Sequence, residues 1–166
     1  MNFGIAVEKA KKAGIPCRML MVKDDVAIEN ALQPRGIAGT VFVNKVAGAA
    51  AERGYSLDKV YEIASAAAEN VFSVGMSMTV CAIPGSAPGD RLHGDLVEYG
   101  LGIHGEPGVE RTPLSSSKQT CKRLVEYLTN AVDGKIGRPY AVLINNLGSL
   151  PPLEMSIVVA DCCSAL

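Results

Sequence analysis

The most informative stretch of the sequence is LVEYGLGIHGEPG, positions 96–108, where an apolar run leads directly into a glycine-rich loop. Leu96–Ile103 has the composition of a buried strand. Glycine has no side chain, so Gly102, Gly105 and Gly108 let the backbone turn sharply and let a ligand approach closely. The stretch therefore predicts a strand that ends in a loop suited to binding or chemistry.

Helical and strand-like patterns alternate on both sides of this stretch. Apolar residues at helical spacing predict helices over residues 2–13, 36–53, 57–74, 116–132 and 151–166. Short apolar runs predict further strands over residues 17–22, 76–83 and 140–144, and residues 104–112 are predicted to be a loop. Ser56 is a candidate N-cap, and Ser116 followed by Gln119 matches a capping box. The alternation predicts an α/β fold, with a mixed sheet covered by helices.

The length of the chain fits one domain. A chain of 166 residues is long enough to bury a core. A subdomain junction is predicted near Gly75, where long helices give way to strands. The βα unit at 140–166 would normally lead into a further strand. The pattern therefore predicts that residues 1–166 form a single partial region, truncated at both ends.

Composition argues against several classes of protein. The formal charge of −1, the aromatic content of 5% and the absence of Trp do not suit a nucleic-acid binder. No stretch has the length of a membrane span, and the N-terminus lacks the order of a signal peptide. Five cysteines without a CxxC spacing favour free thiols, with the adjacent Cys162 and Cys163 buried. A reduced, cytoplasmic compartment is expected.

His104 is the leading candidate for chemistry. A neutral imidazole near pH 7 can act as a nucleophile, a base or a metal ligand. Taken from residue types alone, an exposed turn histidine is an equally good interpretation. A zinc site that recruits His93 and Glu106 is a further alternative, but the spacing matches no familiar site. His93 lies in a turn-rich loop and is predicted to be solvated.

Three motifs carry a resemblance to a known family. They are RGIAGTV with KVAGAAAE at 35–41 and 45–52, GIHGEPG at 102–108, and INNLG at 144–148. In this order and spacing they resemble the substrate-binding subunit of dihydroxyacetone (glycerone) kinases. The resemblance covers nearly the whole chain and implies a partial DhaK-type fold.

The resemblance implies a specific role for the loop. The histidine of GIHGEPG forms a covalent hemiaminal with the carbonyl carbon of dihydroxyacetone in that family, which makes His104 the catalytic residue here. The surrounding residues Gly102, Gly105, Glu106 and Gly108 would form the substrate-binding loop, with Glu106 bracing it through hydrogen bonds. Glyceraldehyde could bind in the same way, whereas glycerol has no carbonyl group to react. The Asn145-Asn146 pair could serve either as turn residues or as ligand contacts.

The resemblance also implies what lies outside this chain. The family's general-base histidine and its substrate-site aspartate belong before residue 1, and Asp24 and Asp25 are interpreted instead as strand-exit or capping residues. ATP and magnesium are expected on a separate nucleotide-binding domain or subunit, so no cofactor or metal is predicted on this chain. The parent protein is expected to be a homodimer, and the chain alone to be inactive. A non-catalytic dihydroxyacetone-binding sensor or coactivator, and an inert structural remnant, are the alternatives.

Overall fold

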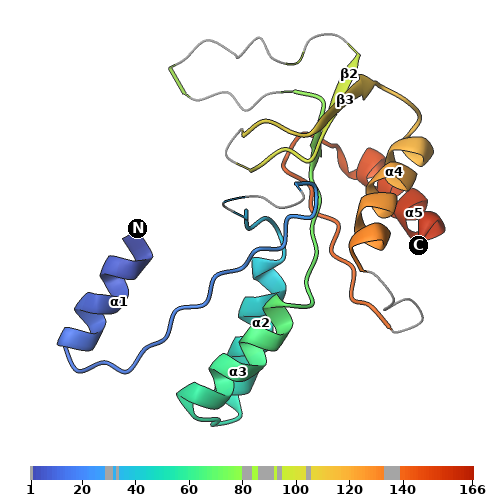
Figure 1. The fold of residues 1–166 in the computed structure, drawn as a ribbon. Helices are drawn as coiled ribbons and strands as arrows, with labels where there is room; N and C mark the ends of the chain where they lie inside the picture. Colours follow the sequence, from blue (N-terminus) through green and yellow to red (C-terminus); the bar gives the residue numbers. More distant parts are fainter. Residues whose placement is uncertain are drawn as a thin grey trace.

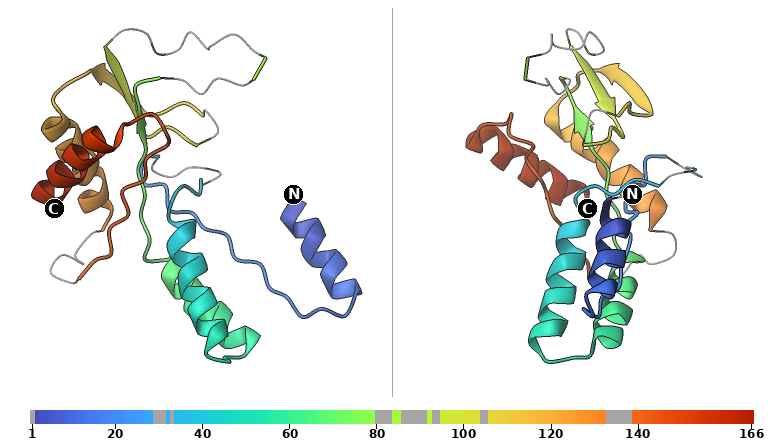
Figure 2. Two further views of the ribbon diagram at one scale, coloured as in Figure 1. Left: turned by 180° about the vertical axis from the view of Figure 1, so that it is seen from behind. Right: turned by 90° about the vertical axis from the view of Figure 1, so that its left-hand side faces the viewer.

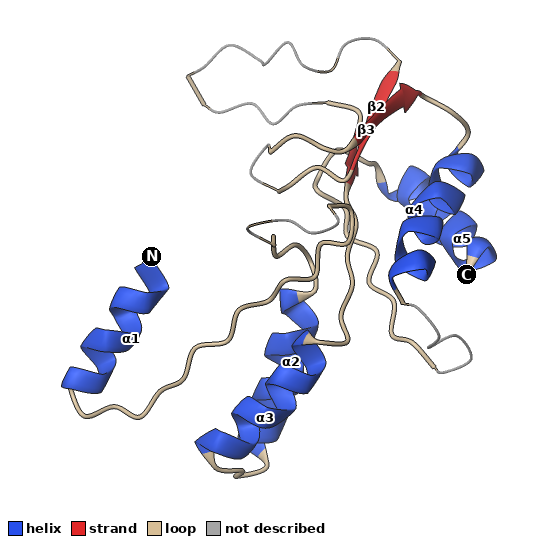
Figure 3. Cartoon of the chain, viewed as in Figure 1, coloured by secondary structure: helices blue, strands red, loops and turns tan. Residues whose placement is uncertain are grey.

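A computed structural model describes residues 2–28, 32, 34–79, 84–85, 92, 95–103, 106–132 and 139–166. Its elements in chain order are α1 (Asn2–Lys12), α2 (Thr40–Glu52), α3 (Leu57–Ala68), β1 (Met76–Ser77), β2 (Leu96–Tyr99), β3 (Glu110–Pro113), α4 (Ser117–Ala131) and α5 (Pro152–Ala165). Helices and a small sheet share the chain (Figures 1 and 3), so the predicted α/β class is confirmed. Within the described ranges, no helix combines the length and the apolar character needed to cross a bilayer.

The sheet is antiparallel, with the strand order β1-β2-β3. The central strand β2 supplies the buried residues Val97, Glu98 and Tyr99, which are at most 3% exposed. A parallel bridge between Asp25 and Ser73 lies outside the sheet. The described strands therefore form an antiparallel sheet rather than the predicted mixed one.

The helix α4 covers one face of this sheet. Its Tyr127 ring stacks on Tyr99 of β2, with ring centroids 6.5 Å apart. The helix α5 packs against α4 in turn (Figure 1), and Cys121 and Cys162 are buried there. The N-cap predicted for α4 is confirmed, since the Ser116 hydroxyl accepts a hydrogen bond from the backbone N–H of Gln119, while the Gln119 side chain contacts that hydroxyl. This unit of sheet and two helices contains half of the buried apolar residues among those described: Val97, Tyr99, Cys121, Val125 and Cys162.

The helices α2 and α3 form a separate hairpin (Figure 2), in which Val43, Ala50 and Ala64 are buried. The predicted N-cap of α3 is confirmed, because the Ser56 side chain accepts a hydrogen bond from Lys59 N. The helix α3 ends at Ala68 rather than near residue 74. The reason is tertiary: the backbone N–H of Ser73 donates to Asp24 O, which holds this part of the chain extended.

Two predicted strands do not join the sheet. Residues 17–22 and 140–144 carry no strand assignment and lie outside the sheet of the described residues. Their apolar side chains are largely exposed, with Met21 60% and Val142 51% accessible. A strand requires a neighbour for its backbone N–H and C=O groups. The apolar pattern therefore predicted strands at both places, but no neighbouring strand pairs with them among the described residues.

The strand boundaries near the glycine-rich loop also differ from the prediction. The strand β2 ends at Tyr99 rather than Ile103, because Gly100 has a positive φ of 71° that turns the backbone out of the sheet. Residues 110–112 were expected to be loop, and this was wrong, since they belong to β3. The strand predicted from residue 76 is present only as β1, and its end at 80–83 lies outside the described residues.

The adjacent cysteines near the C-terminus occupy opposite environments. Cys162 is 8% exposed and faces α4, whereas Cys163 is exposed, so the prediction that both are buried is half wrong. Neighbouring helical residues point about 100° apart. Burial raises the pKa of Cys162 to about 12, with a further contribution from Cys121.

We expect iodoacetamide at pH 8 to modify Cys163 well before Cys162. The thiolate is the reactive form, and a thiol with a pKa near 12 is almost fully protonated at that pH. Peptide mass spectrometry over a time course would measure the order. Equal rates at both positions would show that α5 does not pack on α4 as described.

Candidate functional site

The loop of the GIHGEPG motif connects β2 to β3 as a hairpin, so its ends lie side by side. The backbone N–H of Val109 donates to the carbonyl oxygen of Tyr99 at 2.9 Å. The backbone N–H of Gly100 donates to Gly75 O at 2.7 Å, which joins the loop to the segment before β1. The prediction of a loop at the exit of β2 is confirmed, and the structure adds that the chain returns directly along the same strand.

Two glycines of the motif are required by close contacts within the chain. The Glu106 side chain lies over Gly102, so a Cβ at position 102 would overlap Oε2 of Glu106 and lie 2.7 Å from its Cδ. The Gly102 N–H also donates to the Glu106 backbone carbonyl at 3.1 Å. A Cβ at Gly108 would overlap the carbonyl oxygen of Tyr99. The described glycines therefore let the loop fold on itself, and the Glu106 backbone braces it.

His104 and Gly105 lie outside the described residues, and so does His93. Their neighbour Ile103 is 48% exposed. The role of His104 and that of the Glu106 carboxylate thus remain predictions. Among the described residues, no group of three His, Cys, Asp or Glu side chains is arranged to hold a metal ion.

Asp24 and Asp25 were interpreted as strand-exit or capping residues, but neither caps a described helix: both carboxylates accept hydrogen bonds from backbone N–H groups of loops. Asp24 is 1% exposed, and its carboxylate accepts hydrogen bonds from the backbone N–H groups of Ile37 and Gly39, both at 2.8 Å. This holds the RGIAGT motif as a loop before α2, so the helix begins at Thr40 rather than Gly36.

The INNLG motif forms a turn. The side-chain oxygen of Asn146 accepts hydrogen bonds from the backbone N–H groups of Gly148 and Leu150, and its amide donates to Leu150 O. Gly148 has a positive φ of 109°, which favours glycine. For Asn146, turn chemistry is therefore confirmed over ligand contact.

The strand β3 is joined to α4 by polar side chains next to the hairpin. Oε2 of Glu110 accepts hydrogen bonds from Arg123 Nη2 at 2.9 Å and from the Tyr127 hydroxyl at 2.8 Å. The hydrogen bond from Arg123, followed by that from Tyr127, lowers the pKa of Glu110. Burial, followed by the hydrogen bond to Glu110, raises the pKa of Tyr127. Glu110 therefore remains ionised at neutral pH and keeps β3 against the helix.

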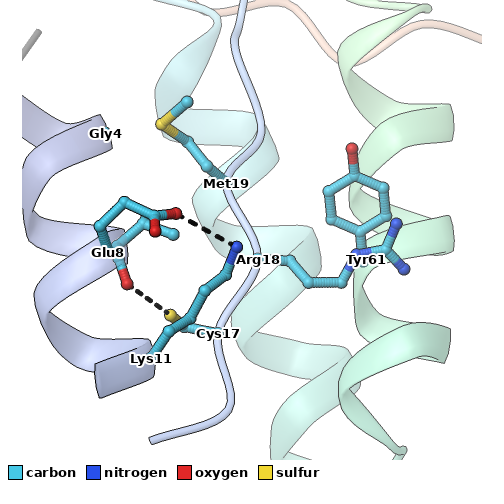
Figure 4. A pocket seen from close by; sticks show the side chains of 8 residues that line it. Gly4, Glu8, Lys11, Cys17, Arg18, Met19 and Tyr61 are labelled. Carbon is cyan, nitrogen blue, oxygen red and sulfur yellow. Dashed lines mark hydrogen bonds and ion pairs between the residues drawn. The ribbon is translucent and has the colours of Figure 1, made fainter. Parts of the chain in front are cut away.

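A hollow of about 320 Å³ lies between α1, the segment at 17–19 and α3 (Figure 4). Its wall includes Arg18, which lies over the Tyr61 ring at 3.5 Å from Cζ to the ring centroid and pairs with the exposed Asp58. The hollow is open to solvent and has only exposed ion pairs. The contacts of Arg18 hold the segment after α1 against α3. We therefore interpret them as structural.

Arg35 is a residue that the sequence patterns did not single out. Its guanidinium contacts Asp25 and two backbone carbonyls, those of Gly100 and Pro107, which precede and follow His104 in the sequence. The sequence places Arg35 more than 60 residues from that motif, and no local pattern predicts such a contact. The resemblance included Arg35 only as the first residue of a motif.

Comparisons with known proteins define the family. The model of the Dak1 domain matches residues 1–166. The dihydroxyacetone kinase of Citrobacter freundii is 42% identical over 99% of this chain and 30% of its own length. Its crystal structure superposes with a TM-score of 0.91. The chain belongs to the Dak1 domain family, which confirms the resemblance drawn from the three motifs.

Two further relatives show how the domain is used elsewhere. The dihydroxyacetone-binding subunit DhaK of a PTS-dependent kinase from Lactococcus lactis is 36% identical, over 97% of this chain and 50% of the subunit. The structure of a dihydroxyacetone kinase operon co-activator, DhaQ, has a TM-score of 0.89 at 27% identity, over 98% of this chain and 51% of that protein. The chain thus spans between about a third and a half of these relatives.

Proposed function

We propose that this chain is the substrate-binding part of a dihydroxyacetone kinase and that His104 holds dihydroxyacetone or glyceraldehyde as a covalent hemiaminal. The observation that carries the proposal is the hairpin loop with the GIHGEPG motif, held at both ends in a chain that belongs to the Dak1 family. Relatives named for dihydroxyacetone kinase activity and for dihydroxyacetone binding support the choice of substrate.

The proposed step is an addition. The lone pair of an imidazole nitrogen attacks the carbonyl carbon, a C–N bond forms, and the carbonyl π electrons move to oxygen, which gains a proton. The other ring nitrogen gives up its proton to solvent, which balances the proton gained by the oxygen. No atom of the substrate or of the histidine is therefore lost overall. The adduct then presents a hydroxyl group in a fixed orientation for phosphoryl transfer, which removes much of the entropic cost of the encounter.

We assign the phosphate donor, whether ATP with magnesium or a phosphoprotein, to a nucleotide-binding domain or subunit that would be the partner of this chain. The names of relatives as PTS-dependent kinase subunits support a partner of this kind. A homodimer and a cytoplasmic location complete the proposal.

Intact mass spectrometry under native conditions tests the covalent step. We expect dihydroxyacetone to raise the mass by one whole triose, because the addition expels no atom. The variant His104→Ala should show no gain, and glycerol, which has no carbonyl, should give none with the unmodified chain. Borohydride should be left out, since the adduct contains no imine to reduce. A mass gain that persists in His104→Ala would contradict the assignment.

The similarity to the DhaQ co-activator supports a second candidate. A sensor would form the adduct without transferring phosphate. Supplying a family kinase's nucleotide-binding domain or subunit with its donor separates the two functions. Release of a triose phosphate supports the kinase, whereas a stable adduct without turnover supports the sensor.

A further inference from the structure

Arg35 connects both ends of the histidine-bearing loop. Its Nη2 donates to the carbonyl oxygen of Gly100 at 2.7 Å, and its Nη1 lies 3.4 Å from the carbonyl oxygen of Pro107. Residues 101–106, which include His104, lie between these two positions in the sequence. A single side chain therefore bonds to the loop before and after the proposed nucleophile.

Asp25 fixes the direction of this guanidinium. The Nε and Nη2 atoms of Arg35 lie 2.6 and 2.5 Å from Oδ2 of Asp25, whose side chain is 2% exposed. The other carboxylate oxygen accepts the backbone N–H of Ala27 at 3.0 Å, and the Asp25 N–H donates to Arg35 O at 3.2 Å. The parallel bridge to Ser73 holds Asp25 in turn. The planar guanidinium thus has one edge fixed on a carboxylate and directs its other N–H groups toward the loop.

We propose that Arg35 is a positioning residue, which sets how the loop presents His104 by fixing Gly100 and Pro107. The inference rests on the proposed function, in which His104 reacts with the substrate. Four glycines stand at positions 100, 102, 105 and 108, and such a segment has many conformations open to it. An external anchor at both ends reduces that freedom, and a nucleophile held in one orientation reacts far more readily.

The chemistry of the side chain explains why arginine is needed. Guanidinium offers five N–H donors in a rigid fork, whereas lysine offers one compact ammonium group. Arg35→Lys keeps a positive charge beside Asp25 but cannot bond to the carboxylate and both carbonyls in the same geometry. This variant therefore separates the anchoring of the loop from the ion pair, whereas Arg35→Ala would also leave a buried carboxylate without its counter-charge.

The test measures the loop and the adduct separately in Arg35→Lys. We expect the amide protons of Gly100, Gly102 and Val109 to exchange about tenfold faster, and the dihydroxyacetone concentration for half-formation of the adduct to rise about tenfold, the factor that one lost charge-assisted hydrogen bond implies. Exchange in α4 should stay unchanged, because α4 lies outside the contacts of Arg35. Arg18→Lys, the same substitution at an exposed ion pair, is the control and should match the unmodified chain in every measurement.

Three results would overturn the inference. The first is that the loop amides of Arg35→Lys exchange at the same rate as in the unmodified chain. The second is that exchange becomes faster evenly over the whole chain. The third is that loop exchange becomes faster while the dihydroxyacetone concentration for half-formation of the adduct stays the same. The proposed function fails separately: if the unmodified chain forms no adduct, this chain does not hold the substrate by itself, while loop exchange still decides whether Arg35 anchors the hairpin.

Discussion

Gly108→Ala is expected to lower the free energy of unfolding by about 3 kcal/mol, the upper range for overpacking. A Cβ at this position would overlap the carbonyl oxygen of Tyr99 and lie 2.7 Å from Cγ of the buried Glu98. Tyr99 O belongs to the backbone of the central strand and accepts the hydrogen bond from Val109 N, so it cannot rotate away as a side chain would. The hairpin must open for the methyl group to fit.

Urea unfolding followed by circular dichroism would measure the loss. Gly48→Ala is the matched control, because a Cβ there meets no atom within 4 Å and the residue lies inside α2. That substitution should stabilise the chain by about 1 kcal/mol, the difference in helix propensity. Gly102→Ala should fall between them, since its nearest obstacle is the movable carboxylate of Glu106. Unfolding midpoints that are equal for Gly108→Ala and Gly48→Ala would show that the hairpin is not closed at Tyr99.

Asp24→Asn is expected to cost about 3 kcal/mol, as removal of a buried acceptor leaves a donor unsatisfied. The carboxylate uses one oxygen for Ile37 N and the other for Gly39 N, and it is 1% exposed. Asparagine has the same shape, but one oxygen becomes an NH₂ group that faces a backbone N–H. The loop before α2 would then lose one of the two hydrogen bonds that hold it to position 24.

The control for this variant is Asp58→Asn. Asp58 has a side chain that is 85% exposed, and its pair with Arg18 is on the surface. An exposed ion pair contributes little, so the change should stay within about 0.5 kcal/mol. Both values come from the same urea titration. A loss at Asp24 no larger than that at Asp58 would mean that the backbone N–H groups of the loop find other acceptors.

The sequence was most informative where structure is determined locally. The caps Ser56 and Ser116 and the turn at Asn146 each depend on residues within four positions. Both caps and the starts of their helices were predicted in place, and the turn is one of the two alternatives given for the Asn pair. The loop at the exit of β2 was likewise predicted from local sequence, namely the glycines at 102, 105 and 108.

The sequence was least informative where structure depends on distant residues. The apolar runs at 17–22 and 140–144 have the composition of strands, but pairing requires a neighbour that composition does not reveal. The start of α2 depends on Asp24, 15 residues away from Gly39. Arg35 was missed as part of the site because its two carbonyl partners are 65 and 72 residues away.

This division between near and distant contacts has a kinetic consequence for the loop. The hairpin of β2 and β3 closes only residues 100–109, and a β-hairpin forms in about 1–10 μs because little chain entropy is lost. The bonds from Arg35 close a segment of 65 residues or more and must form later in folding. Substitutions in the hairpin should therefore slow folding, whereas substitutions at Arg35 should mainly speed unfolding. The chain acquires the shape of its reactive loop first and its orientation afterwards.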